Sequence, residues 1–441
     1  MKIIEYTLGI SPFRRGGLPR YSTDLADELA ITNDVYVLYP GKINLFRNKK
    51  IKLIKKNNSH KFSLVELINP LPVSLGLGID ESNVFMEKKD ISLLMNFIDN
   101  IKPDVIHFHT FMGFPLEALE EIKKRKIKMV FTTHDYYGFC PKMLLDNPKK
   151  ELKFHACSLD CMLCNRGPSY KKLILMQSRV YEFLKNTALI KKIRKLQKKQ
   201  LENETFKDGI IENEEVNARY NLRKYYEKMY KLIDEFHFNS AVARDYIKQF
   251  LPNIHGKVIN ITHSGLEDNR KLREYKDNKV IKIGYIGIYD AKKGFFEFIE
   301  SLKEVRKKHL NFEVYFYGDI VNNVFFNNKW VHNMGVKKES EMRKVYRNID
   351  LLVLPSIWHE TFGFVTLEAT LEGTPVLVSQ NVGAKGILSE KNIFFDKEDL
   401  IDKLNSILTS GLGELRIQTK NFDIMYNMKN HSKVIEKEFY Q

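Results

Sequence analysis

The sequence predicts an α/β protein built from two doubly wound domains. Short apolar segments with the composition of strands alternate with amphipathic helical segments, the pattern of parallel sheets covered by helices. This alternation starts afresh in mid-chain, where "KVIKIGYIGIYDAKKGFFEFIESLKEV" has the order strand, glycine turn and helix. The length of 441 residues also exceeds what one core commonly serves. Ligands are therefore expected at the carboxyl ends of the strands.

The elements can be placed in order along the chain. "MKIIEY" at the start is predicted to be a strand rather than a signal peptide, because charge and polarity return at once. Helical spacing predicts an amphipathic helix over 114–126. Further strands of the first half are predicted at 34–40, 104–110, 128–135, 233–240 and 257–265. The domains join near 267–277, and the second half adds strands at 279–286, 312–319, 329–335, 349–356 and 374–380.

Net charge of +16 predicts attraction to anions. The excess is concentrated between Tyr170 and Lys231, where apolar residues recur at helical spacing. These helices are either a solvated surface or a cationic face that lies on anionic lipid. Nucleic acid is not an expected partner, because aromatic residues are not interleaved with the basic ones. No apolar run reaches the roughly 20 residues that span a bilayer. The expected location is the cytoplasm, with peripheral contact at the inner face of the cell membrane.

The segment "LPSIWHETFGFVTLEATLEGTPVL" carries the strongest functional signal. It is predicted to form a buried strand, a loop with Glu360, and a helix that ends at Gly373. Gly363 offers an open amide near the helix start, and Glu368 lies in the early turns. Carboxylates accept hydrogen bonds from sugar or ribose hydroxyls, while a helix N-terminus favours a diphosphate. Together they indicate a nucleotide-sugar site; the alternative is that Glu368 faces solvent or an ion pair.

Two glycine turns repeat at equivalent places in the two halves. Gly16 and Gly17 follow the first strand, and Lys293 precedes Gly294 after the first strand of the second half. Bare backbone at such turns can approach a phosphate, and a lysine adds a point charge. Taken alone, Gly16 and Gly17 are better explained as a turn that binds nothing, and the turn at Lys293 is equally weak evidence for a ligand.

The E-x7-E pattern of "ETFGFVTLE", between an "LPS" strand and a "GTPV" strand, resembles the signature of retaining GT-B glycosyltransferases of family 4. Further matches occur in the expected order: "GGLPRY", "VIHFHT", "FTTHD", "HSGLED", "GYIG…KKG" and "MGVKKESEMRKVYRNIDLLVLPS". The resemblance spans nearly the whole chain except the basic insertion at 165–231. It implies two Rossmann-like domains facing a central cleft: an N-terminal acceptor domain (1–268), a nucleotide-sugar domain (277–420) and a C-terminal helix (421–441) crossing back.

The resemblance also implies roles for individual residues. Glu360 would contact the donor sugar, Glu368 the ribose hydroxyls, and His134 the sugar near the reacting carbon. Lys293, helped by Gly17, would neutralise the diphosphate. Backbone groups of Gly335 and Val336 would contact the base. The remaining donor contacts would come from the turn formed by Phe362, Gly363, Phe364 and Val365, and from Gly16.

One position departs from the family. Gly287 is followed by Ile288, where an arginine is usual, so one cation expected on the diphosphate is missing. Lys292 or N-domain arginines at 14, 15 and 20 could replace it. The implied mechanism is same-face substitution with retained (alpha) configuration, assisted by the departing phosphate oxygen. No Asp-x-Asp motif occurs in the chain, so no catalytic metal is expected.

All four cysteines lie close together in the chain: Cys140, Cys157, Cys161 and Cys164. Clustered cysteines in a cytosolic protein favour metal over disulfides, and four thiolates suit a structural Zn²⁺. An iron–sulfur cluster and free buried thiols are the alternatives. A subset of the same family resembles this arrangement, with "HD", then "CP", then a cysteine cluster.

These observations predict a glycosyltransferase that moves a sugar from a nucleotide-diphosphate sugar to a surface-glycan or lipid-linked acceptor. The rival from another class is a non-catalytic nucleotide-sugar-binding or assembly subunit, favoured by Ile288. A GT-B epimerase ranks last, because its own signature residues are not evident.

Overall fold

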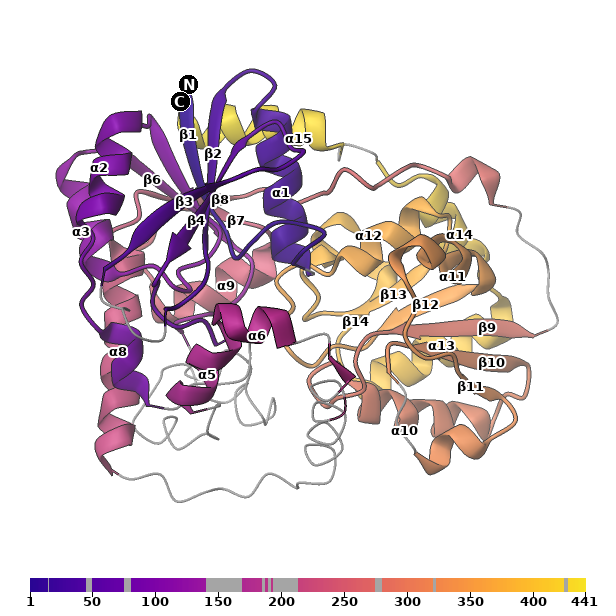
Figure 1. Cartoon of the computed structure of the whole chain (residues 1–441). Coiled ribbons are helices and arrows are strands. Elements are labelled where there is room, and N and C mark those ends of the chain that lie inside the picture. Colours follow the sequence, from indigo (N-terminus) through magenta and orange to yellow (C-terminus); the bar gives the residue numbers. More distant parts are fainter. Residues whose placement is uncertain are drawn as a thin grey trace.

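The computed structural model describes residues 1–14, 16–44, 50–74, 81–139, 169–184, 187–188, 192, 213–273, 280–319, 323–423 and 427–441. Two α/β domains lie side by side, each built around its own sheet (Figure 1). The predicted fold class is confirmed. In the described part of the chain, no helix is long and apolar enough to cross a bilayer.

The N-terminal domain has an eight-stranded sheet in the order β3-β4-β2-β1-β5-β6-β7-β8. Its strands are β1 Lys2–Tyr6, β2 Asp34–Pro40, β3 Lys52–Lys56, β4 Ser63–Ile68, β5 Val105–Phe108, β6 Lys128–Thr133, β7 Glu235–Phe238 and β8 Gly256–Val258. Every pairing is parallel except that of β3 with β4. The carboxyl ends of β1, β5, β6 and β7 therefore meet at one edge, which faces the second domain.

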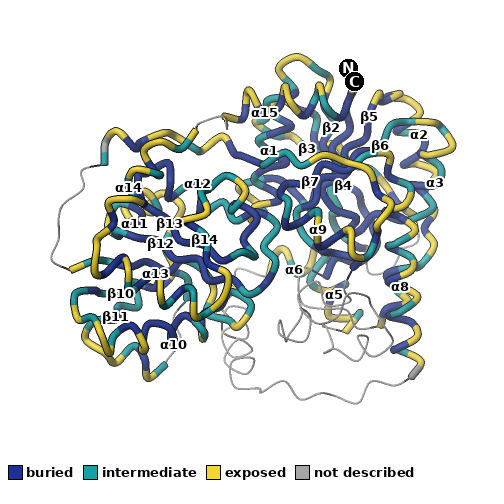
Figure 2. The backbone as a smooth tube through the Cα atoms, turned by 180° about the vertical axis from the view of Figure 1, so that it is seen from behind, coloured by how far each residue is buried: buried dark blue, intermediate teal, exposed yellow. Residues whose placement is uncertain are grey.

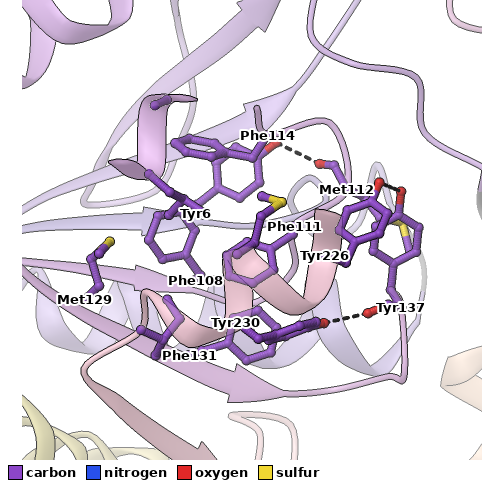
Figure 3. Packing of buried hydrophobic residues seen from close by; sticks show 14 of the residues in the cluster. Tyr6, Phe108, Phe111, Met112, Phe114, Met129, Phe131, Tyr137, Tyr226 and Tyr230 are labelled. Carbon is purple, nitrogen blue, oxygen red and sulfur yellow. Dashed lines mark hydrogen bonds between the residues drawn. The ribbon is translucent and has the colours of Figure 1, made fainter. Parts of the chain in front are cut away.

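Helices cover both faces of this sheet, as the alternation of side chains requires. They are α1 Gly17–Leu29, α2 Ser92–Ile101, α3 Leu116–Lys124, α5 Tyr170–Met176, α6 Arg179–Leu184, α8 Asn213–Lys231 and α9 Ala241–Phe250. Ile4 and Tyr6 of β1 point into a core with α2, α3 and α8, whereas Ile3 points toward α1. Figure 3 shows the aromatic part of the first core, where the Tyr230 hydroxyl donates to the Tyr137 carbonyl at 2.5 Å.

The C-terminal domain has a six-stranded parallel sheet in the order β11-β10-β9-β12-β13-β14. Its strands are β9 Ile281–Ile286, β10 Phe312–Tyr317, β11 Val331–Asn333, β12 Leu351–Leu354, β13 Val376–Ser379 and β14 Ile393–Phe394. Its helices are α10 Phe295–Arg306, α11 Met342–Asn348, α12 Phe364–Leu371, α13 Lys397–Ser410 and α14 Gly413–Lys420. The central strands β12 and β13 are buried along their whole length, as expected of a parallel sheet covered on both faces, whereas β9, β10, β11 and β14 mix buried and intermediate residues (Figure 2).

The chain returns to the first domain at its end. Helix α15 (Met428–Ile435) continues into a π-helix, Glu436–Tyr440, and packs beside α1 (Figure 1). Met428, Ile435 and Phe439 are buried in the same apolar cluster as Tyr21 of α1. That cluster extends to Leu367 of α12, so one apolar layer joins the two domains.

The structure corrects the sequence-based elements in two places. Of the strand predicted at 257–265, only residues 257 and 258 belong to β8, because the chain then leaves the sheet and carries His263 to the second domain. Strands β3 and β4 were not predicted; β3, the edge strand "KLIKK", has too few apolar residues to stand out. Of the basic insertion, residues 165–168 and most of 185–212 lie outside the described residues, as do all four cysteines.

Candidate active site

The loop between β12 and α12 holds Glu360 against the segment that follows β13, where it forms a parallel bridge with Val382. The Glu360 amide donates to the Asn381 carbonyl at 2.9 Å, and its own carbonyl accepts from the Gly383 amide at 2.9 Å. Gly363 begins the next helix with a φ of 94°, a left-handed conformation that favours glycine. A Cβ there would lie 3.0 Å from Oε2 of Glu360. The glycine thus keeps open the space beside the carboxylate.

Lys293 forms an ion pair with Glu360. Its turn is fixed by the bond from the Lys293 amide to Oδ1 of Asp290 at 2.9 Å and by Gly294, whose φ is 68°. A Cβ on Gly294 would lie 1.7 Å from the Pro355 carbonyl oxygen. The two segments that the sequence predicted to face the donor are therefore in direct contact. Ile288 is 51% exposed and brings no charge to this region.

Glu368 faces the junction of the domains, where it meets three polar groups. Tyr346 donates to Oε2 at 2.5 Å, His263 contacts Oε1 at 3.1 Å, and Arg20 of α1 donates to Oε1 at 3.2 Å. Burial alone would raise the pKa of Glu368, but these partners hold it below its ordinary value. The ion-pair alternative raised by the sequence is thus present in this structure, and a ribose would have to share the carboxylate.

His134 lies where β6 ends, directly against the donor loop. Its carbonyl accepts from the Thr361 hydroxyl at 2.9 Å, and Ser240 donates to the Thr361 carbonyl at 2.5 Å. Its ring Nε2 lies 3.0 Å from Nδ1 of His109. Burial and neighbouring histidines lower the pKa of His134 well below the ordinary value, so the ring is neutral. The imidazole and the Glu360 loop therefore belong to one site.

The remaining predicted residues fall in two places: beside the starts of α1 and α12, and directly after β11. Gly17 begins α1 and approaches the ring of Phe364, 3.4 Å from where a Cβ would be. Gly16 is the residue before that helix, with a φ of 130°. Phe362 is buried and Val365 is partly buried in α12. Gly335 follows β11 with a φ of 65°, and Val336 beside it is 70% exposed.

Sequence reasoning named Arg20 only as a possible cation for the diphosphate, and it missed the other supporting residues: Glu5, His107, His109, His263 and Tyr346. The "VIHFHT" segment did contain a signal, because alternate residues of a strand share one face. Glu5, His107 and His109 have ligand-type atoms within 4.8 Å of one another. Nε2 of His109 and Oε2 of Glu5 are however in direct hydrogen-bond contact at 2.6 Å. Ligands around one zinc ion at about 2.1 Å stand about 3.4 Å apart, so this group is arranged as a hydrogen-bond chain.

Comparisons with known proteins agree with this architecture. Residues 15–165 match the family model "Glycosyltransferase Family 4", and 267–422 match "Glycosyl transferases group 1". An alpha,alpha-trehalose-phosphate synthase (UDP-forming) from Burkholderia xenovorans, in complex with glucose-6-phosphate, is 9% identical with a TM-score of 0.59 and 100% of both chains covered. The apo lipopolysaccharide outer core galactosyltransferase WaaB is 11% identical with a TM-score of 0.55, covering 99% of both chains.

A curated relative is the "Uncharacterized 41.2 kDa protein in cps region" of Klebsiella pneumoniae, 26% identical over 306 residues. The match covers 66% of this chain and 63% of that relative's length. The two α/β domains and these structural neighbours define a GT-B fold. With both family models matched in order, the chain belongs to the GT-B glycosyltransferases of the family 4 type.

Proposed function

We propose that this protein transfers a sugar from a nucleotide-diphosphate sugar to a surface-glycan or lipid-linked acceptor, with retention of configuration. One observation carries the proposal: Glu360, Lys293, Glu368 and His134 converge from separate segments on the junction of the two domains. Such convergence at the carboxyl ends of two facing parallel sheets is typical of a bound nucleotide and its transferred group.

The donor would occupy the C-terminal side of this junction. The ribose hydroxyls would bond to Glu368, and the diphosphate would take Lys293 from its present pairing with Glu360. Glu360, once released, could accept hydrogen bonds from the sugar. The base would lie along the backbone of Gly335 and Val336. The Burkholderia synthase, described as UDP-forming, supports a nucleotide-diphosphate donor.

The charge distribution at the reacting end suits departure of the diphosphate, a step that the proposed retaining mechanism needs. His134 is neutral because burial lowers its pKa, while Lys293 provides a positive charge nearby for the departing phosphate. Cations at the leaving group stabilise the charge that develops in the transition state. In this mechanism a phosphate oxygen of the leaving group takes the acceptor hydroxyl proton. The new bond then forms on the face from which the diphosphate departs.

The acceptor would enter through a cavity of about 830 Å³ in the N-terminal domain, next to the start of α1. Its walls combine apolar side chains with Arg14 and Arg179, which suits an amphiphilic, anionic acceptor. Lys42 and Lys56 also line it but are paired with Glu182 and Glu66. The cps-region relative and the lipopolysaccharide galactosyltransferase support a cell-surface glycan as the product.

The test is a calorimetric titration of the full chain against nucleoside diphosphates and sugar nucleotides, with Glu368→Gln as the variant. Glu304→Gln is the matched control, because Glu304 is an exposed carboxylate of α10 paired with Lys307, the residue that follows this helix. We expect saturable binding to one base, weakened at least tenfold by Glu368→Gln and unchanged by Glu304→Gln. Failure of the folded wild type to bind any nucleotide would refute the donor site.

A non-catalytic nucleotide-sugar-binding subunit is the second candidate, favoured by the exposed Ile288 at a position where the family has an arginine. Both candidates bind the donor, so binding does not separate them. Transfer to a lipid-diphosphate sugar, or slow release of free sugar from the bound donor, would exclude the non-catalytic subunit. Binding without either reaction would favour it.

A further inference from the structure

A chain of buried hydrogen bonds runs behind His134 through the sheet of the N-terminal domain. It starts at the Ile259 carbonyl and passes through His237, Thr132, His107, Tyr440, Glu5 and His109 before it reaches His134. Glu5, His107, His109 and His237 are each fully buried. Strands β1, β5, β6 and β7 supply these residues side by side, and the π-helix supplies Tyr440.

The Ile259 carbonyl, at one end of this row of hydrogen bonds, determines which atom donates in each of the bonds that follow. The Ile259 carbonyl can only accept, so His237 carries its proton on Nε2, 2.7 Å away. Burial lowers the pKa of His237 well below its ordinary value, so its Nδ1 is unprotonated and accepts from the Thr132 hydroxyl at 2.8 Å. Thr132 must then accept from Nε2 of His107, 2.6 Å away.

Tyr440 lies between His107 and Glu5 in this chain of hydrogen bonds. The Tyr440 hydroxyl lies 2.7 Å from Nδ1 of His107 and 3.0 Å from Oε1 of Glu5. Burial raises the pKa of Glu5, but contacts with His107 and His109 outweigh it and bring the pKa to about 2, so the carboxylate is ionised at neutral pH. Oε2 of Glu5 carries no proton and is an acceptor.

This result determines the state of the two histidines that follow. His109 donates from Nε2 to Oε2 of Glu5 at 2.6 Å, and burial lowers its pKa to about 4. A neutral His109 then has its lone pair on Nδ1, which accepts from Nε2 of His134 at 3.0 Å. In the described part of the chain, Nδ1 of His134 has no hydrogen-bond partner and bears a lone pair.

We propose that Glu5 and His109 are positioning residues that hold His134 as its Nε2–H tautomer, so that Nδ1 accepts a hydrogen bond from a hydroxyl of the bound sugar. The proposal rests on the proposed function for its effect on turnover. The tautomer of His134 would also affect which sugar is bound. A sugar with an acceptor atom or a deoxy carbon opposite Nδ1 of His134 would lose this hydrogen bond. Carboxylate-backed histidines gain orientation and a defined tautomer in the same way.

Two substitutions of Glu5 test whether it acts through its hydrogen bond to His109 or only by filling space in the core. In Glu5→Gln the amide oxygen can accept from His109 while the amide NH₂ donates to Tyr440, whose proton turns to a neutral His107. Every bond is kept, and the His134 tautomer with it. Glu5→Met has similar volume but gives His109 no acceptor. Tyr6→Phe is the matched control, because it removes a buried hydrogen bond from the adjacent residue of β1, to the Met112 carbonyl at 2.8 Å.

The measurement is ¹⁵N NMR of the full chain with labelled histidines, which reads the tautomer of His134 without any need for turnover. We expect the Nε2–H form in wild type, Glu5→Gln and Tyr6→Phe, and a mixture of tautomers in Glu5→Met. Where transfer is measurable, kcat of Glu5→Met should fall about tenfold, the loss of one hydrogen bond. The kcat values of Glu5→Gln and Tyr6→Phe should stay near wild type.

An Nδ1–H tautomer of His134 in the wild type would overturn the proposal, as would an unchanged tautomer in folded Glu5→Met. If Glu5→Met does not fold, His109→Leu and His109→Gln make the same comparison, because only the glutamine can bond to both Glu5 and His134. If the protein shows the expected tautomers but transfers no sugar, the proposed function is refuted. The proposal that Glu5 and His109 set the tautomer of His134 would still hold.

Discussion

Gly294→Ala is the substitution whose effect follows most directly from the geometry of the donor side. The new Cβ would lie 1.7 Å from the Pro355 carbonyl oxygen, so the turn and the end of β12 must separate by more than an ångström. A left-handed φ of 68° costs a non-glycine residue a further 1–2 kcal/mol or so. Together these effects should destabilise the C-terminal domain by roughly 2–4 kcal/mol.

Lys293 precedes this glycine, so the same displacement should weaken binding of the nucleotide diphosphate at least tenfold. Thermal unfolding measures the first effect, with an expected drop of roughly 5–10 °C, and calorimetry measures the second. Gly386→Ala makes the same chemical change where nothing lies within 4 Å, so it should match wild type in both assays. Wild-type stability and affinity in Gly294→Ala would refute the argument that this turn is held against β12.

Three further predictions concern charge and metal. Lys293→Met should weaken binding of a nucleoside diphosphate by about 1.5–3 kcal/mol in calorimetry, and leave binding of the nucleoside unchanged; equal losses for both ligands would contradict a diphosphate contact. The pKa of Glu368 is below its ordinary value of 4.5, so its stabilisation is present above pH 4.5 and is lost as pH falls through the lower folded value. The stability difference between wild type and Glu368→Gln should therefore be constant near neutral pH and shrink below about pH 4.5 in denaturant titrations. Metal analysis should find one zinc per chain, lost in Cys161→Ser; a metal-free, folded wild type would exclude the structural site.

The sequence could predict those features that depend on local pattern. Continuous apolar runs such as 351–354 and 376–379 identify buried strands, and the spacing of Glu360 and Glu368 around Gly363 places both acids near one helix start. Partners distant in the chain could not be found in this way. Arg20 meets Glu368 across 348 residues, and Tyr440 meets Glu5 across 435, so only the folded topology brings them together. The half-buried edge strand β3 was missed because its lysines hide the apolar alternation.

The return of the chain to the first domain limits how the two domains can move. Among the described elements, the polypeptide passes from one domain to the other between β8 and β9, and back between α14 and α15. Two covalent connections restrict the relative motion of the domains to a hinge rotation about the line that joins the connections. Rotation about any other axis is resisted. A protease that cuts one crossing should leave the domains attached through the other, and Tyr440 in place against Glu5.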